Sequence, residues 1–148
     1  MKHLANISLV SLFLASSLFG AETKSSKIIP EDWVPALAPS IKSALEQLKE
    51  ASSQAQMNSL SREVADMTDA QLFVAYIRLY EKLSAKERAK LVEEQAQWLK
   101  KRPKAAEAAV ESKGGSLAPL EANNAELTYT EHRLVELRAR FKAAGKKE

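Results

Sequence analysis

The sequence predicts an all-α protein, a small helical bundle of four to five helices with a glycine-containing loop before the last helix. From residue 40 onward, apolar residues recur at spacings of three and four, which places them on one face of an α-helix. Serine, threonine or proline residues, which often begin helices, precede several of these runs. No segment shows the strict alternation of polar and apolar residues that is typical of a half-buried strand.

The first 21 residues have the features of a secretory signal peptide. Lys2 supplies the positive charge, an apolar run extends over residues 4–19, and the small residues Gly20 and Ala21 follow. The run is short and rich in serine, so we expect no membrane span. The pattern predicts an exported protein, periplasmic or secreted, that is cleaved near residues 20–22. Because the chain has no cysteine, it has neither a lipoprotein anchor nor a disulfide.

Residues 22–39 form a leader segment, because three closely spaced prolines disfavour a continuous helix there. The helical domain is predicted over residues 40–142, followed by a basic tail at 143–148. Its first apolar face contains Ile41, Ala44, Leu45 and Leu48. A serine-rich join near residues 51–54 favours a break, although the pattern leaves open whether residues 40–67 form one helix or two.

Two segments have the spacing of a capping box, in which a side chain at each end satisfies an amide of the first helical turn. Thr68 with Gln71 predicts one helix boundary, and Ser84 with Glu87 predicts a second boundary or a kink. The helix that follows is expected over residues 85–102, with Pro103 ending it. Its inner face is expected to contain Ala89, Val92, Ala96 and Leu99.

Residues 103–118 are predicted to be the main interruption, with a turn at KGGS, and Pro119 can begin the final helix. Spacings of three and four run along that helix and are typical of a seam that packs on another helix. The seam contains Leu120, Leu127, Thr130, Leu134, Leu137 and Phe141. Packing within the chain and a homodimer both explain it.

Trp98 lies in a polar and apolar stripe with Leu91, Gln95 and Arg102, beside the expected inner face. A tryptophan there can bury its ring at a helix–helix seam. Exposed, the same pair of Trp98 and Arg102 would have the composition of a protein-binding hot spot. Both interpretations follow from the spacing.

Three segments together resemble the LprI-type lysozyme-inhibitor family: QAQWLKKR, KGGS and TEHRLVEL, within residues 72–141. The matching residues are Gln95, Trp98, Arg102, Gly114, Gly115, Ser116, Thr130, Arg133 and Leu137. That family usually has a cysteine near each of the positions of Ala106 and Ala125, so the resemblance implies that these two alanines lie close together.

The resemblance also implies a protein partner, a lysozyme, that is inhibited sterically by the loop at 103–118. The candidate partner contacts are Trp98, Arg102, Lys113, Gly114 and Gly115. The alternative is an envelope scaffold module, dimeric or not, without activity on lysozyme. A formal net charge of +3 gives no long-range attraction to a basic lysozyme.

The sequence does not predict an enzyme. After the signal peptide the only histidine is His132, which we expect on the surface, so neither a metal site nor a catalytic triad can be assembled around it. Glu93 and Glu94 are adjacent and point in different directions on a helix. No glycine-rich phosphate loop is present, and no cofactor is predicted. Charges of both signs alternate along the chain, which argues against nucleic-acid binding.

Overall fold

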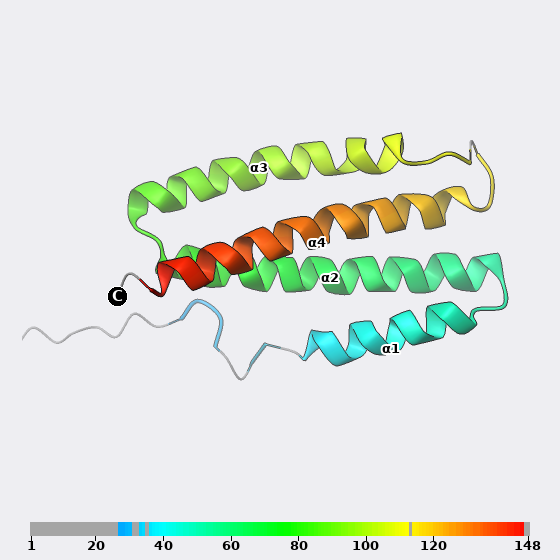
Figure 1. The fold of residues 1–148 in the computed structure, drawn as a ribbon, viewed down its shortest axis with the longest axis horizontal. Helices are drawn as coiled ribbons and strands as arrows, with labels where there is room; N and C mark the ends of the chain where they lie inside the picture. The colour runs from blue at the N-terminus through cyan, green and yellow to red at the C-terminus, as the bar shows by residue number, and fades with distance from the viewer. Residues whose placement is uncertain (1–26, 31–32, 35, 113, 147–148) are drawn as a thin grey trace, which may run out of the picture.

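The computed structural model describes residues 27–30, 33–34, 36–112 and 114–146, and these form four α-helices. Helix α1 spans Leu37–Glu50, α2 Gln54–Lys82, α3 Ala85–Ala108 and α4 Ala118–Ala144 (Figure 1). No strand occurs in these ranges, so the predicted all-α fold is confirmed. The expected signal peptide at 1–21 and Lys113 lie outside the described residues. Within them, no helix is both long and apolar enough to cross a bilayer.

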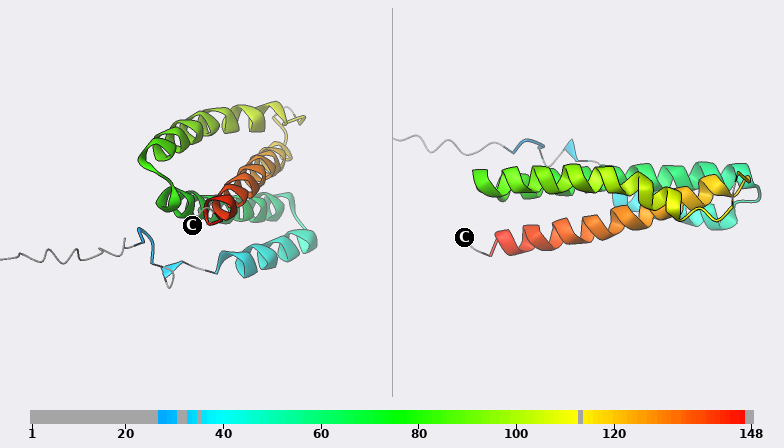
Figure 2. Two further views of the ribbon diagram at one scale, coloured as in Figure 1. Left: turned by 60° about the vertical axis from the view of Figure 1, so that its left-hand side comes forward. Right: turned by 90° about the horizontal axis from the view of Figure 1, so that it is seen from above.

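The long helices α2 and α4 pack extensively along each other and form the centre of the molecule. Helix α1 packs on α2 and helix α3 packs on α4, so α1 and α3 flank the central pair on opposite sides (Figure 2). The core lies where α2, α3 and α4 meet. It contains Leu72, Leu79, Leu91, Leu134 and Leu137. The seam predicted on the final helix therefore packs within the chain.

Local signals mark three of the helix starts. Residues 51–53 separate α1 from α2, so residues 40–67 belong to two helices, and the Ser53 hydroxyl accepts a hydrogen bond from the amide of Gln56. The capping box at Ser84 is present: the amide of Ser84 donates to Glu87 at 3.0 Å, and the amide of Glu87 donates to the Ser84 hydroxyl. Pro119 lies in the first turn of α4, as its fixed φ favours.

The boundary predicted at Thr68 is wrong, because α2 continues through it without a break. The Thr68 hydroxyl is buried and donates to the carbonyl oxygen of Val64 at 2.8 Å instead of capping a new helix. Val64 and Leu72, on either side, are both buried. Continuous burial of this face stabilises the long helix more than a cap would stabilise two short ones.

The end predicted at Pro103 is also wrong, since α3 continues to Ala108 with the proline inside it. Proline removes the N–H that would donate to the carbonyl of Leu99. Contacts on both sides hold the helix together despite this loss: Arg102 forms an ion pair with Asp69, and Ala106 is buried. The interruption between α3 and α4 is therefore only residues 109–117.

The face of α3 that points inward differs from the predicted one. Leu91 is fully buried and Trp98 packs against the core, whereas the residues expected inside are exposed. These are Ala89, Val92, Ala96 and Leu99. The physical reason is that α3 lies mainly against α4 and contacts α2 only weakly, so the side of α3 that faces α2 is left open.

Candidate functional site

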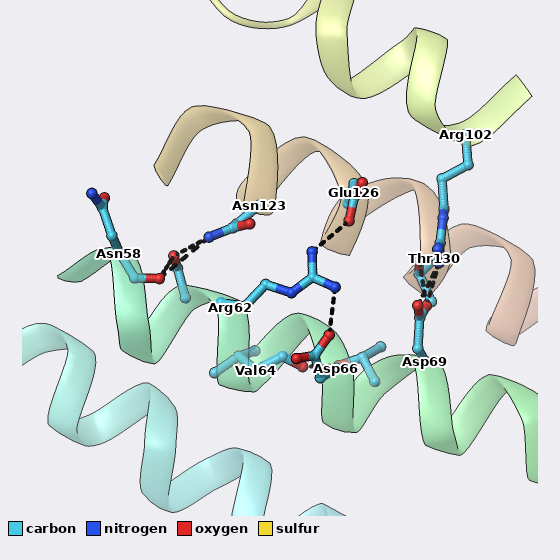
Figure 3. A network of polar contacts seen from close by, with 11 residues as sticks. Asn58, Arg62, Val64, Asp66, Asp69, Arg102, Asn123, Glu126 and Thr130 are labelled. Atoms are coloured by element: carbon cyan, nitrogen blue, oxygen red, sulfur yellow. Dashed lines mark hydrogen bonds and ion pairs between the residues drawn. The ribbon is translucent and has the colours of Figure 1, made fainter. Parts of the chain in front are cut away.

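Asp69 joins three helices at one polar centre. Arg102 of α3 donates from Nη1 to both carboxylate oxygens of Asp69 on α2, at 2.5 and 2.6 Å. Thr130 of α4 donates from its hydroxyl to Asp69 Oδ1 at 3.2 Å and accepts from Arg102 at 3.5 Å (Figure 3). Two residues of the sequence pattern thus meet here. Sequence reasoning missed Asp69, because an aspartate within a long helix carries no local signal of its partner.

A second group of polar contacts lies two turns before Arg102 on α3 and one turn after Thr130 on α4. Arg133 is only 7% exposed and donates from Nε to the side-chain oxygen of Gln95 at 3.1 Å. Its Nη1 donates to both carboxylate oxygens of Glu136 at 2.7 Å. Glu94 accepts from Arg140 at 2.6 Å, and this hydrogen bond holds the pKa of Glu94 below its usual value. These contacts fix the register of α3 on α4.

The Trp98 ring is held between side chains of its own chain. It stacks on Tyr129 of α4 with ring centroids 5.4 Å apart, and the Arg102 guanidinium lies 5.3 Å from its centroid. The ring also packs against the leucine core. These contacts are those of a helix–helix seam, the first of the two interpretations of Trp98. A contact with a partner through Trp98 or Arg102 stays a prediction.

Beside these contacts, an open groove of about 440 Å³ runs between α2 and α3. Asp69, Arg102 and Trp98 are among the residues that line it. Phe73 and Leu99 on its rims are 59% and 50% exposed. The groove is the consequence of the weak contact between α2 and α3, and it presents apolar surface that a closed bundle would bury.

The loop at 109–117 is attached to the bundle by two polar contacts. Glu121, in the first turn of α4, accepts from the amides of Glu111 and Ser112 at 2.9 Å each and from the Ser112 hydroxyl at 2.5 Å. Asn58 of α2 donates to the carbonyl oxygen of Ser116 at 3.1 Å. The hydrogen bond from the Ser112 hydroxyl, followed by those from the amides, lowers the pKa of Glu121.

Gly114 has a φ of +74°, a conformation that glycine adopts without strain, and this explains one glycine of the GGS turn. Gly115, Ser116 and Leu117 are exposed at the same end of the bundle. The sequence indicated this turn but not its attachment, because Glu121 looked like one of many surface carboxylates.

Among the residues that the structure places, no group of three or more His, Asp or Glu side chains could hold a metal ion. His132 is exposed, as expected.

Comparison with models of known protein families gives a match. A family model described as "Lysozyme inhibitor LprI" matches residues 45–137. The match begins earlier than the segment predicted from the motif, so it includes the second half of α1 and all of α2. No curated protein and no solved structure matches the chain. Ala106 and Ala125, where that family usually has cysteines, are buried and half-buried, and the chain has no cysteine to link them.

Proposed function

This chain belongs to the LprI lysozyme-inhibitor family, and we propose that it is an exported, non-enzymatic binding protein that inhibits a lysozyme. The observation that carries the proposal is the family match, which extends over more than half of the chain and over the three helices that form the core. Inhibition would be steric, with part of the bundle blocking the cleft in which the enzyme binds its substrate.

We assign the blocking element to the loop at 109–117, with Gly114 and Gly115 as contacts. It lies at one end of an elongated bundle, the end at which α1 turns into α2 (Figure 1). Its contacts with Glu121 and Asn58 order it before a partner arrives. A loop that is already ordered loses less conformational entropy on binding, which favours affinity. Leu117, 42% exposed beside the turn, offers an apolar contact.

In this arrangement Trp98 and Arg102 do not contact the partner and instead position the loop. Their contacts with Tyr129 and Asp69 hold α3 against the rest of the bundle, and α3 leads directly into residue 109. Loss of either side chain would therefore disturb the loop through the position of α3.

The net charge of +3 predicts how binding responds to salt. A basic inhibitor gains no electrostatic steering toward a basic enzyme, so recognition has to come from short-range contacts. We expect inhibition of such a lysozyme to change little, or to increase slightly, between low and physiological salt.

A lysis assay tests the proposal. The purified mature protein is added to several lysozyme classes acting on cell walls, at both salt concentrations. Gly115→Arg adds bulk to the loop at a position with no positive φ and no close contact. Val135→Arg is the control, because it adds the same side chain to α4 at a residue that is 66% exposed. We expect stoichiometric inhibition that Gly115→Arg weakens and Val135→Arg does not.

Two results would contradict this proposal in different ways. If the folded protein inhibits none of the lysozyme classes, lysozyme is not its partner. Inhibition that survives Gly115→Arg but is lost in Leu99→Arg moves the contact from the loop to the groove between α2 and α3. Both variants are checked by circular dichroism for native helix content.

The alternative function, an envelope scaffold module, is favoured by the exposed apolar rim of that groove, Phe73 and Leu99. A dimer through the final seam is not favoured, because Thr130, Leu134 and Leu137 are buried within one chain. Size-exclusion chromatography with light scattering distinguishes a monomer from a dimer built on any other surface.

A further inference from the structure

A second hollow, of about 460 Å³, lies between the start of α1 and the C-terminal halves of α2 and α4. This volume is in the range of sites that bind small molecules. Leu37 of α1, Val74 and Ala75 of α2, and Phe141 of α4 give it mostly apolar walls. The loop at 109–117 contacts the opposite end of α2 through Asn58, so this site is separate from the proposed inhibitory element.

Among the described residues, the only charged side chains that line this hollow are two arginines. Arg78 has a side chain that is 17% exposed, and its Nη1 atom is buried without a hydrogen-bond partner. Its nearest carboxylate oxygen, in Glu81, is 3.6 Å away and so is too far for a hydrogen bond. Arg138 donates to Gln71 at 3.4 Å and forms no ion pair with any described residue. Even with Glu81 counted, the described residues leave one uncompensated positive charge in this wall.

The start of α1 adds to this positive field. The residue before the helix is Ala36, which provides no side-chain cap, and the first turn contains no acidic residue. Leu37 and Ala38 line the hollow, and the amides of this first turn, at the positive end of the helix dipole, have no capping side chain. This contribution supports the arginines and would not define a site alone.

We propose that this hollow binds a free aliphatic carboxylate, a fatty acid, with its chain on the apolar walls and its carboxylate between Arg78 and Arg138. The carboxylate would supply the counterion that Arg138 lacks among the described residues and that Glu81, 3.6 Å from Arg78, supplies only in part. A small anion would leave the apolar walls open to water, and a neutral chain would leave the two guanidinium groups without that counterion. An anion with an alkyl chain satisfies both features.

Calorimetric titration of the mature protein with decanoate, below its micelle concentration, tests this inference. We expect saturable binding of one decanoate per chain, and no measurable binding of acetate or of decyltrimethylammonium. Arg138→Gln should weaken decanoate binding about tenfold or more, the effect expected when a charged hydrogen bond is lost. Lys142→Gln removes one positive charge from the next turn of α4, outside the hollow, and should leave the affinity unchanged.

The outcomes separate this site from other sources of binding. Equal affinity for decyltrimethylammonium, or an affinity that Arg138→Gln does not change, would refute the carboxylate site. Binding only to phosphatidylglycerol vesicles, and not to free decanoate, would also refute it, because a lipid surface would then be the ligand. Val74→Glu places a negative charge in the apolar wall and should abolish decanoate binding in a protein that keeps its helical spectrum. Lysozyme inhibition is measured on the same variants and should persist, so the two proposals fail independently.

Discussion

The ion pair between Asp69 and Arg102 should be one of the strongest polar contacts in the protein. Its two hydrogen bonds are 2.5 and 2.6 Å long, and the Arg102 side chain is 19% exposed. Breaking a fully buried pair typically costs about 3–5 kcal/mol in unfolding free energy. The Asp69 side chain is 35% exposed, so water screens part of this interaction. We therefore expect a coupling energy of about 1–2 kcal/mol between the two side chains.

A double-mutant cycle measures this coupling. Asp69→Asn, Arg102→Gln and the double variant are unfolded in urea and followed by circular dichroism, and the free energies are compared at equal denaturant slopes. Arg62 and Glu126 provide a matched control between α2 and α4. Their atoms are 3.4 Å apart, and the side chains are 54% and 24% exposed, so we expect a coupling of about 0.5 kcal/mol or less (Figure 3).

The comparison between the two cycles decides the result. If the coupling of Asp69 with Arg102 is no larger than that of Arg62 with Glu126, then the polar centre does not hold the three helices together. The role given to Arg102 in positioning the loop would then also fail, since that role depends on α3 being fixed by this contact.

Three further predictions concern α3 and its loop. Leu91→Ala should lower the unfolding free energy by about 2–5 kcal/mol and Leu99→Ala by less than about 1 kcal/mol, because only Leu91 is buried. Equal losses of unfolding free energy for the two variants would mean that Leu99 also lies on the inner face, as the sequence predicted. Pro103→Ala should raise the melting temperature, since alanine returns an N–H to a helix interior where proline typically costs about 3 kcal/mol, and a lower melting temperature would contradict this. Glu121→Gln should reduce hydrogen-exchange protection of the Ser112 amide. In the unmodified protein the same protection should be present at neutral pH and lost as the pH falls through the lowered pKa of Glu121, and protection that is independent of pH would argue against this attachment.

The sequence predicted the helices where local chemistry determines them. The Ser84–Glu87 capping box and Pro119 act within one helical turn, so their effect can be inferred from neighbouring residues. Thr68 with Gln71 has the same spacing but does not start a helix. The difference lies in tertiary packing: the buried face on both sides of Thr68 lies against other helices, and a local pattern contains no information about that burial.

The face of α3 illustrates a second limit. Leu91 and Trp98 form one stripe, and Val92 and Leu99 form the adjacent one, only one residue apart along the helix. Both stripes contain large apolar residues, so helical periodicity cannot decide which is buried. The choice depends on α3 packing against α4 and lying apart from α2, which is a property of the whole arrangement. The partner of Arg102 was missed for the same reason, because Asp69 is 33 residues away.

The helical residues that carry the family resemblance pair mainly with one another and with the core, whereas those of the glycine turn are exposed. Gln95 contacts Arg133, Arg102 contacts Thr130, and Leu137 is fully buried beneath them. In a chain without cysteines, these contacts determine how α3 lies on α4 and hence where the loop between them projects. A motif made of such internal pairs specifies an architecture, and it places few of its atoms where a partner can touch them. Partner choice then has to depend on the surfaces outside these pairs, which is why the loop, the groove and the arginine-lined hollow are tested with separate variants.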